Sequence, residues 1–486
     1  MSSAGGRHAE PRRLDFPERF LFGVGSAAFQ IEGAAGAGGK GESVWDRFAG
    51  RRRGLSGSET ACDHYNRLEE DLDLLAELGV NAYRFSISWP RVLPRGHGRI
   101  NHAGLDFYHR LVDGLLARGI TPFATLFHWD TPQVLEARIG GFKNRDIAAY
   151  FGEFARIVAR RLGFLLSLFA TITVPSDYSI MGHLLGAHAP GKRGLRSLFA
   201  SIHHQLLAHG HAVRAIRDEV PGASVGYCPN IWRINPATDS ILDRRAARIF
   251  SQFFNTVYID PVLLGEYPTD LFTRFVRFFP AIREGDLGVI STPIDFLGIN
   301  TYTRHRAAHC GLVPFFHGIL DFHPVPRREY KKGGRHFTSM GWEVHPPSIR
   351  RVLNWAWERY NVPLYVTESG AAFTDRCVDG FCADDARRDY LVAYLRETAA
   401  AVVDGADVRG YFVWTFMDNF EWSFAYKKRF GLIYVDFETL DRRFKKSGLW
   451  YRRFLSGSSE VPSPPGVPPG HRPPPPRSSP PPPSET

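Results

Sequence analysis

The sequence lacks any long hydrophobic run: none of its 486 residues belongs to a stretch of roughly 18 apolar residues, the length that a membrane-spanning helix needs. The first ten residues, Met1 to Glu10, are polar and contain no apolar segment of the kind that a secretory signal peptide carries. These absences predict a soluble cytoplasmic protein with no membrane partner.

Cysteine is also scarce. The five cysteines are Cys62, Cys228, Cys310, Cys377 and Cys382. A small, odd number argues against a disulfide framework and for a reducing compartment. Cys377 and Cys382 are close together in a polar loop, where we expect two unpaired thiols, because a metal site would require more ligands nearby. Neither the histidines nor the cysteines show metal-ligand spacing, so we expect no metal and no other cofactor.

Basic charge is in excess, with 60 Lys and Arg against 50 Asp and Glu and a formal net charge of +10. The arginines are nevertheless scattered, and only Arg51, Arg52 and Arg53 form a run. A scattered distribution indicates a solvated surface rather than a face that binds a polyanion. We therefore expect no nucleic-acid partner.

The composition changes at the C-terminus, where residues 456–486 are rich in Pro, Ser and Gly and include the proline runs 473–476 and 480–483. Such a segment cannot pack a core, and we expect an extended, disordered tail. It either is an inert extension or docks weakly into an aromatic-lined groove of a partner. The predicted organisation is a disordered segment 1–14, one folded domain 15–455 and a disordered Pro-rich tail 456–486.

Between residues 15 and 455, short apolar or β-branched runs alternate with longer amphipathic stretches. This alternation is typical of parallel strands joined by helices. The eight expected strands are 20–26, 81–88, 121–129, 168–173, 224–227, 295–302, 363–368 and 409–417. The leucine-rich segment 63–78 predicts one of the intervening helices. These patterns predict an α/β fold, a single (β/α)8 TIM barrel.

Polar and aromatic residues fall near the carboxyl ends of these strands, where such a barrel places its chemistry. They are Gln30 after the first strand, His128 and Trp129 at the end of the third, Thr173 at the end of the fourth, Tyr302 at the sixth, Glu368 at the seventh, and Trp414, Glu421 and Trp422 in or beyond the eighth. Any one of them alone would be read as structural. Together they indicate a sugar site, because amide, imidazole and carboxylate groups bind hydroxyls while an aromatic ring packs against a sugar's apolar face.

Seven motifs extend this pattern along the chain. They are SAAFQIEG at 26–33, YRFSISWPR at 83–91, LFHWDTPQ at 126–133, GINTY at 298–302, VTESG at 366–370, WTFMDNFEW at 414–422 and RFGLIYVD at 429–436. With these motifs the chain resembles glycoside hydrolase family 1, the β-glucosidase-like barrels, over essentially residues 15–455. The resemblance implies a retaining β-glycosidase that acts on a small-molecule β-glycoside.

The resemblance also implies roles for individual residues. Glu368 matches the family's nucleophile, and Arg84 and Tyr302 match the pair that flanks it, which would hold the carboxylate ionised and oriented. The residues implied to bind substrate are Gln30, His128, Trp129, Thr173, Asn300, Trp414, Glu421 and Trp422. A carboxylate at Glu421 would repel a sugar phosphate, so the resemblance implies an unphosphorylated hexose such as glucose, galactose or fucose.

The fourth strand departs from the family pattern. The family has Asn-Glu-Pro there, with the Glu as acid and then base, whereas this chain has Thr173, Val174 and Pro175. A retaining glycosidase needs a nucleophilic carboxylate and a second carboxyl group about 5 Å away, and Val174 cannot supply the second. Asp177 and His183 follow Val174 and either could replace the acid, although helix capping and packing suit their positions better.

Three functions follow from this departure. The chain is a retaining β-glycosidase that is attenuated or restricted to activated aglycones, or a transglycosylase, or a carbohydrate-binding protein without activity. The loss of acid–base assistance costs roughly 10²–10⁴-fold in rate, and least for an aglycone that leaves as a stable anion. Aglycone specificity would depend on variable loops such as 304–335, where we expect a lid.

Overall fold

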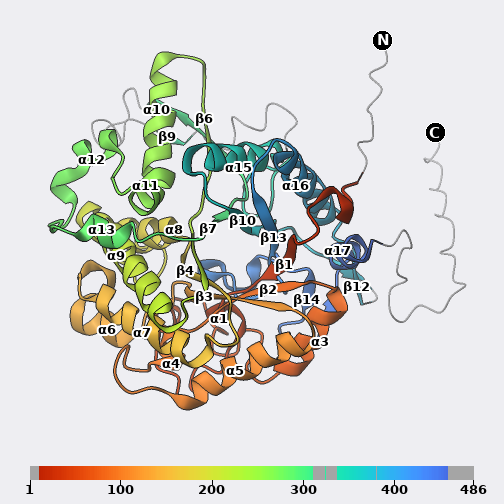
Figure 1. Cartoon of the computed structure of the whole chain (residues 1–486). Coiled ribbons are helices and arrows are strands. Elements are labelled where there is room, and N and C mark those ends of the chain that lie inside the picture. The colour runs from red at the N-terminus through yellow and green to blue at the C-terminus, as the bar shows by residue number, and fades with distance from the viewer. Residues whose placement is uncertain (1–9, 310–322, 325–335, 379, 458–486) are drawn as a thin grey trace, which may run out of the picture.

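A closed barrel of eight parallel strands forms the centre of the molecule (Figure 1). The computed structural model describes residues 10–309, 323–324, 336–378 and 380–457. The barrel strands are β1 (Leu21–Gly25), β2 (Ala82–Ser86), β3 (Thr121–Phe127), β4 (Leu168–Thr173), β5 (Ser224–Cys228), β7 (Phe296–Asn300), β10 (Leu364–Ser369) and β13 (Val408–Trp414). Their order around the barrel is β1-β13-β10-β7-β5-β4-β3-β2. All eight expected strands are present, which confirms the predicted TIM barrel.

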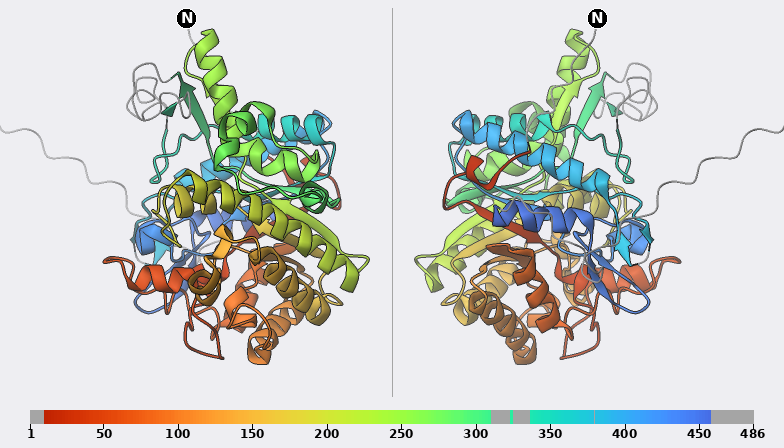
Figure 2. Two further views of the ribbon diagram at one scale, coloured as in Figure 1. Left: turned by 90° about the vertical axis from the view of Figure 1, so that its left-hand side faces the viewer. Right: turned by 90° about the vertical axis from the view of Figure 1, so that its right-hand side faces the viewer.

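Helices cover the outside of the barrel in the three ribbon views (Figures 1 and 2). They are α1 (Ala28–Ile31), α2 (Val44–Gly50), α3 (Leu68–Leu78), α4 (Trp89–Val92), α5 (His102–Ala117), α6 (Gln133–Ile139), α7 (Ile147–Leu162), α8 (Pro175–Ser179), α9 (Leu195–Glu219), α10 (Ile241–Ser251), α11 (Val257–Leu263), α12 (Thr269–Phe275), α13 (Asp286–Ile290), α15 (Pro347–Tyr360), α16 (Asp385–Val403) and α17 (Lys446–Ser456). No helix of the described residues is long and apolar enough to span a bilayer.

Within the described residues, six shorter helical turns connect these elements. They are the 3-10 turns η1 (Arg13–Asp15), η2 (Gly141–Lys143), η5 (Val276–Phe278) and η7 (Trp422–Lys427) and the π-helical turns η3 (Ile180–Leu184) and η4 (Gln252–Thr256). Before the first of them, Glu10 accepts a hydrogen bond from Trp450 Nε1 at 3.0 Å. The described chain therefore contacts the barrel's outer helices before residue 15, where the folded domain was predicted to begin.

The predicted helix 63–78 begins later than expected. Asp63 has a positive φ of 55°, so the chain turns there instead of entering a helix. Helix α3 starts at Leu68, and Leu68, Leu72 and Leu78 are buried at its inner face. It ends at Gly79, whose left-handed backbone stops the helix.

Smaller sheets form outside the barrel. Strands β6 (Arg233–Pro236), β8 (Arg304–Ala308) and β9 (His323–Pro324) form one of them, and helix α10 projects beside it at the top of Figure 1. Strand β8 is the start of the predicted lid 304–335. Most of that segment lies outside the described residues, so the lid stays a prediction.

Two hairpins complete the strands, β11 (Cys377–Val378) with β12 (Phe381–Cys382), and β14 (Ile433–Val435) with β15 (Arg442–Phe444). In the first, Cys377 and Cys382 lie opposite each other and form a disulfide. The expectation of two unpaired thiols was therefore wrong. The hairpin register brings the two side chains together, and the linear spacing alone did not show this register. Cys62 and Cys228 are free and buried.

One layer of apolar side chains fills the barrel interior beneath the functional end. It consists of Ala82, Phe123, Leu168, Ala170, Cys228, Phe296 and Phe412. The ring of Phe123 packs edge-on against Phe296 and Phe412, at centroid distances of 5.6 and 5.5 Å. Gly23 makes room for this layer, because a Cβ there would lie 2.4 Å from the Phe412 ring. The packed layer gives the site above it a rigid floor.

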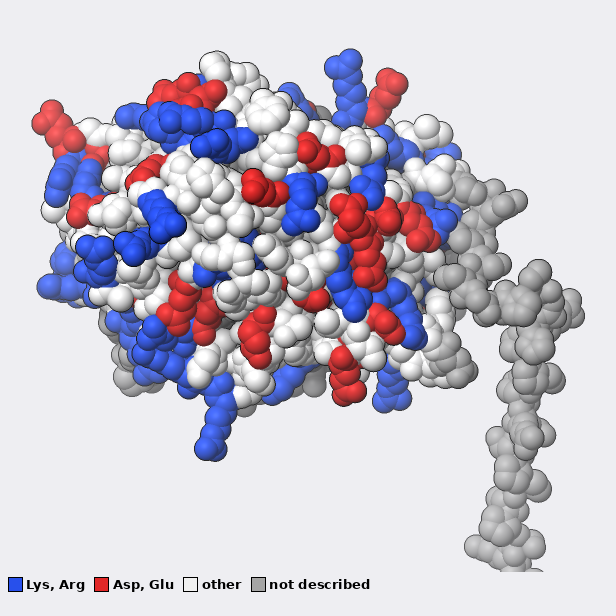
Figure 3. All heavy atoms as spheres, turned by 90° about the horizontal axis from the view of Figure 1, so that it is seen from below, with Lys and Arg blue, Asp and Glu red and all other residues white. Residues whose placement is uncertain are grey.

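Charged side chains of both signs are interspersed on the face of the molecule that Figure 3 shows. Ion pairs also form elsewhere in the described chain, for example between Arg118 and Asp73 at 2.6 Å and between Arg160 and Glu219 at 2.7 Å. On this face the excess of basic residues is distributed among acidic ones, as the scattered arginines of the sequence predicted.

Candidate active site

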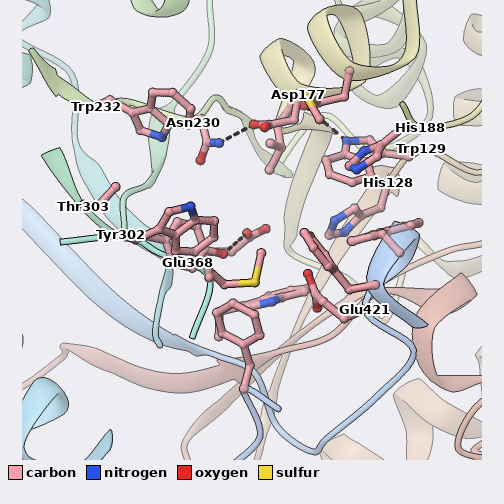
Figure 4. Close-up of a pocket in the computed structure, with 18 residues that line it drawn as sticks. His128, Trp129, Asp177, His188, Asn230, Trp232, Tyr302, Thr303, Glu368 and Glu421 are labelled. Carbon is pink, nitrogen blue, oxygen red and sulfur yellow. Dashed lines mark hydrogen bonds between the residues drawn. The ribbon is translucent and has the colours of Figure 1, made fainter. Parts of the chain in front are cut away.

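A cavity of about 300 Å³ opens at the carboxyl ends of the barrel strands (Figure 4). The residues lining it are His128, Trp129, Val174, Asp177, Met181, His188, Asn230, Trp232, Tyr302, Thr303, Met340, Trp342, Glu368, Trp414, Glu421, Trp422, Phe424 and Phe430. Eight of the predicted site positions are among them. The other four lie directly behind the cavity wall. Three of them form hydrogen bonds with a residue that lines the cavity, namely Gln30, Arg84 and Thr173. The fourth, Asn300, forms a hydrogen bond with Thr173.

Glu368, on β10, is held by three donors from three other parts of the barrel. Arg84 Nη1 on β2 donates to Oε1 at 2.7 Å, and Tyr302 donates its phenol proton to Oε2 at 2.6 Å. Thr173 at the end of β4 donates a weaker bond to Oε1, at 3.3 Å. Burial, and then the Glu368 charge, raise the pKa of Tyr302 well above its ordinary value, so the phenol keeps its proton. The carboxylate is 2% exposed and fixed in orientation.

Thr173 and Asn300 form a supporting layer under this carboxylate. Asn300 Nδ2 donates to Thr173 Oγ1 at 2.9 Å, and Thr367 donates to Asn300 Oδ1 at 2.6 Å. Arg84 is likewise fixed, because its Nε donates to Thr125 Oγ1 at 3.1 Å. Thr173 is thus held in place by Asn300 while it donates to Glu368.

A second carboxyl group, Glu421, lies beyond β13 on another wall of the cavity. Gln30 Nε2 donates to its Oε2 at 3.1 Å and to Asn419 Oδ1 at 3.0 Å. Burial, together with the charge of Glu368, raises the pKa of Glu421 to about 8, against the opposing hydrogen bond from Gln30. Gln30 Oε1 is buried and has no hydrogen-bond partner among the described residues. Polar groups with unused capacity are expected where a sugar's hydroxyls bind.

His128 completes this polar wall after β3. Burial and the positive charge of Arg84 lower its pKa well below the usual value, so the imidazole is neutral. Its Nδ1 is buried, and no group in the described part of the chain forms a hydrogen bond with it. A neutral imidazole offers one donor and one acceptor, which suits a hydroxyl group.

Aromatic rings surround these polar groups. Trp129 and Trp422 are 4.4 Å apart between centroids, and His128 lies 5.6 Å from Trp414. Trp129, Val174 and Trp422 all have positive φ, at 74°, 47° and 46°. Left-handed backbone is unfavourable for large or β-branched residues and concentrates at functional sites, where the surrounding structure maintains it.

The outer wall was not predicted from the sequence. It consists of Met181, Trp232, Met340, Trp342, Phe424 and Phe430, together with Asn230 and His188. These residues come from loops and short turns beyond the strands, so their spacing gave no signal. The wall is mainly apolar and aromatic.

The residue directly after β4, Val174, has an apolar side chain that cannot donate a proton. Val174 lines the cavity, and its backbone oxygen accepts a hydrogen bond from Trp129 Nε1 at 3.2 Å. Of the two nearby alternatives, His183 is buried against Ser197 at 3.0 Å and does not line the cavity. Asp177 does line it, and accepts a hydrogen bond from Asn230 Nδ2 at 2.5 Å.

Comparisons with known proteins match most of the chain. The family description Glycosyl hydrolase family 1 matches residues 12–459. The chain is similar to a "Beta-glucosidase" of Agrobacterium sp., with 43% identity over 447 residues, which are 91% of this chain and 95% of the relative. It is also similar to "Beta-glucosidase A" of Thermotoga maritima, with 42% identity over 450 residues, 91% and 98% of the two chains.

Solved structures show the same likeness. The family 1 β-glucosidase from Thermotoga maritima superimposes with a TM-score of 0.87 at 39% identity, covering 91% of this chain and 98% of the other. The virulence factor SghA, solved with its substrate analogue salicin, superimposes with a TM-score of 0.87 at 42% identity, covering 91% and 97%.

Proposed function

The chain belongs to glycosyl hydrolase family 1 and is an O-glycosyl hydrolase of the retaining β-glycosidase type, and on this premise we propose that it cleaves unphosphorylated β-D-hexosides through a glycosyl ester of Glu368. The proposal includes a preference for aglycones that leave as stable anions. One observation carries it: Glu368 is aligned by Arg84 and Tyr302, while Val174 stands where a proton donor is expected.

In the first step, a carboxylate oxygen of Glu368 attacks the anomeric carbon and the bond from that carbon to the aglycone oxygen breaks. The Arg84 and Tyr302 bonds keep the carboxylate in one orientation, so little reorganisation is needed before attack. In the second step, a water oxygen bonds to the same carbon and releases Glu368. Two inversions return the β configuration.

Sugar binding is assigned to the wall opposite the aglycone. Glu421, His128 and the Gln30 behind them supply donors and acceptors for hydroxyl groups. Trp414 supplies a ring for the sugar's apolar face. None of the described residues that line the cavity is a Lys or Arg that could pair with a phosphate, which supports an unphosphorylated hexose.

The aglycone side supports the preference for activated leaving groups. Trp232, Trp342 and Phe424 offer apolar surface where the aglycone leaves the cavity. An aryl group packs well on such surface, and an aryl oxide is a stable leaving anion. Because general acid assistance is worth roughly 10²–10⁴-fold, an aglycone that needs no proton loses least from Val174.

A second function, sugar binding without catalysis, is favoured by the same Val174. A fluorinated, activated glucoside separates the two functions, since it forms a long-lived ester on a competent nucleophile. We expect intact-protein mass spectrometry to show one added 2-fluoroglucosyl group, and peptide mapping to place it on Glu368. Glu368→Gln should show none. Wild-type protein that binds the sugar but gains no covalent group would identify a carbohydrate-binding protein instead.

A further inference from the structure

The cavity retains a second carboxyl group near the position that Val174 occupies. We propose that Asp177, in helix α8, is the general acid and base of this site and acts on the aglycone oxygen and then on water. This inference rests on the proposed function of Glu368 as nucleophile. It places the missing acid of the fourth strand three positions further along the chain.

The backbone explains how Asp177 reaches the cavity. Strand β4 ends at Thr173, Val174 adopts a left-handed conformation, and α8 begins at once with Pro175. Asp177 is the third residue of this short helix, and it lines the same cavity as Glu368. Figure 4 shows the two carboxyl groups on different sides of the open space. The small Ser176 lies between Val174 and Asp177 and is buried.

The hydrogen bonds of Asp177 leave one oxygen without a side-chain partner. Asn230 Nδ2 donates to Oδ2 at 2.5 Å, and Ser176 Oγ donates to the same oxygen at 3.5 Å. Within the described chain no side chain donates to Oδ1. Asn230 therefore anchors the carboxyl group by one oxygen and leaves the other for a proton that moves to or from a ligand.

Asp177 and Glu368 have contrasting surroundings. Glu368 is paired with Arg84, whereas the side chains of the described residues that bind Asp177 are the uncharged Asn230 and Ser176. Burial, and then the charge of Glu368 against the opposing bond from Asn230, raise the pKa of Asp177 to about 6. A carboxyl group with a cationic partner and a second, buried carboxyl group without one match the arrangement of a nucleophile and an acid in one glycosidase site.

The reaction balances with these two groups. In the first step the proton of Asp177 moves to the aglycone oxygen as Glu368 bonds to the anomeric carbon, which leaves Asp177 ionised. The ester of Glu368 carries no charge, so the repulsion that favoured protonated Asp177 disappears and its pKa falls. In the second step Asp177 accepts a proton from the attacking water, and Glu368 leaves as a carboxylate.

Three other titratable groups of this region have pKa values that are shifted away from pH 6. His188 lines the same cavity, and burial, then the charge of Arg52, lower its pKa to about 4. Tyr258 on α11 interacts with Asp177, and burial raises its pKa far above neutrality. Glu421, on the sugar side, has a pKa raised to about 8. A change in activity near pH 6 would therefore report the titration of Asp177, whose pKa depends on the charge of Glu368.

The test compares Asp177→Asn, which preserves shape, with wild type and with Asp177→Glu, which restores a carboxyl group. Phenyl β-D-glucoside, a poor substrate for an unassisted departure, should lose at least about tenfold in kcat/KM on Asp177→Asn. 2,4-Dinitrophenyl β-D-glucoside should change little in kcat/KM, since its aglycone needs no proton. Asp177→Glu should regain part of the phenyl glucoside rate. Asp146→Asn, an exposed carboxylate near α7, is the matched control and should behave as wild type.

Two further readouts separate a proton-transfer role from a structural one. Azide needs no base, so it should accelerate dinitrophenyl glucoside turnover by Asp177→Asn more than by wild type and yield the β-glucosyl azide. The phenyl glucoside rate of wild type should fall as pH rises through about 6, and Asp177→Asn should lack this limb.

Specific results would overturn the assignment. An equal loss of kcat/KM on both glucosides would exclude Asp177 as the general acid and base. An azide acceleration as large in wild type as in Asp177→Asn would exclude it too. Neither result would affect the assignment of Glu368 as the nucleophile if its ester is trapped. No turnover of either glucoside by wild type would exclude Asp177 as well. Failure to trap Glu368 would instead refute the proposed function itself.

Discussion

Val174→Glu should restore acid assistance directly at the end of the fourth strand. Val174 lines the cavity and is 4% exposed, so a longer side chain from the same Cα would enter the space shared with Glu368. Its left-handed backbone, with φ 47° and ψ 50°, is unfavourable for a β-branched residue. Glutamate is not β-branched, so the backbone should tolerate the substitution.

The magnitude follows from what the cavity already contains. Acid–base assistance is typically worth roughly 10²–10⁴-fold, and Asp177 in our proposal already supplies part of it. For phenyl β-D-glucoside we therefore expect kcat/KM to rise by about 10–100-fold, which corresponds to about 1.4–2.7 kcal/mol of transition-state stabilisation. In an Asp177→Asn background the gain should be larger, because the two carboxyl groups serve one step and their effects are not additive.

Val174→Gln is the matched control, since glutamine has nearly the same shape as glutamate but no acidic proton to transfer. The assay is kcat/KM for phenyl and 2,4-dinitrophenyl glucosides, with thermal unfolding to confirm that the variants are folded. The expected signature is a gain on the phenyl glucoside that Val174→Gln lacks and that is small on the dinitrophenyl glucoside. An equal gain on both substrates, or the same gain with Val174→Gln, would refute the reasoning, because neither depends on proton donation.

Two further predictions concern stability. The pKa of Glu421 is raised from 4.5 to about 8 in the folded state, so its protonation stabilises the fold at low pH, and this stabilisation is lost as pH rises from about 4.5 to about 8. Glu421→Gln should therefore flatten that part of a plot of Tm against pH. An unchanged slope would contradict the assignment. Gly23→Ala would place a Cβ 2.4 Å from the Phe412 ring and 2.6 Å from the Ala82 backbone oxygen. This overlap should lower the free energy of unfolding, measured by urea titration, by about 1–3 kcal/mol. An unchanged free energy of unfolding would show that the apolar layer adjusts more easily than its packing suggests.

Most of the barrel was predictable because its signals are local. Each strand is a short apolar or β-branched run, and all eight expected strands are present within a few residues of their predicted ends. The start of α3 was misplaced because Asp63 adopts a left-handed turn that the leucine pattern does not reveal. The Cys377–Cys382 disulfide was missed because it depends on which residues of a short hairpin lie opposite each other.

The site was only partly predictable. Residues at strand ends, such as Glu368 and Tyr302, were identified because every strand of a parallel barrel delivers its carboxyl end to the same face. The aromatic outer wall was not, because Trp232, Trp342 and Phe424 come from loops whose path depends on the rest of the fold. The tertiary structure also separated two roles that the sequence had combined: Gln30 lies behind Glu421 and holds it, rather than lining the cavity.

The sequence by itself determined the barrel, since strand patterns are properties of neighbouring positions along the chain. It also placed Glu368 and Val174 at the ends of the seventh and fourth strands, where we propose the nucleophile and the replaced acid. Only the tertiary structure decided between Asp177 and His183. Both follow the fourth strand closely, but the helical path after Val174 directs Asp177 into the cavity and buries His183 against Ser197. Side-chain direction depends on how a helix packs against the barrel, and that packing is set by contacts between residues far apart in the sequence.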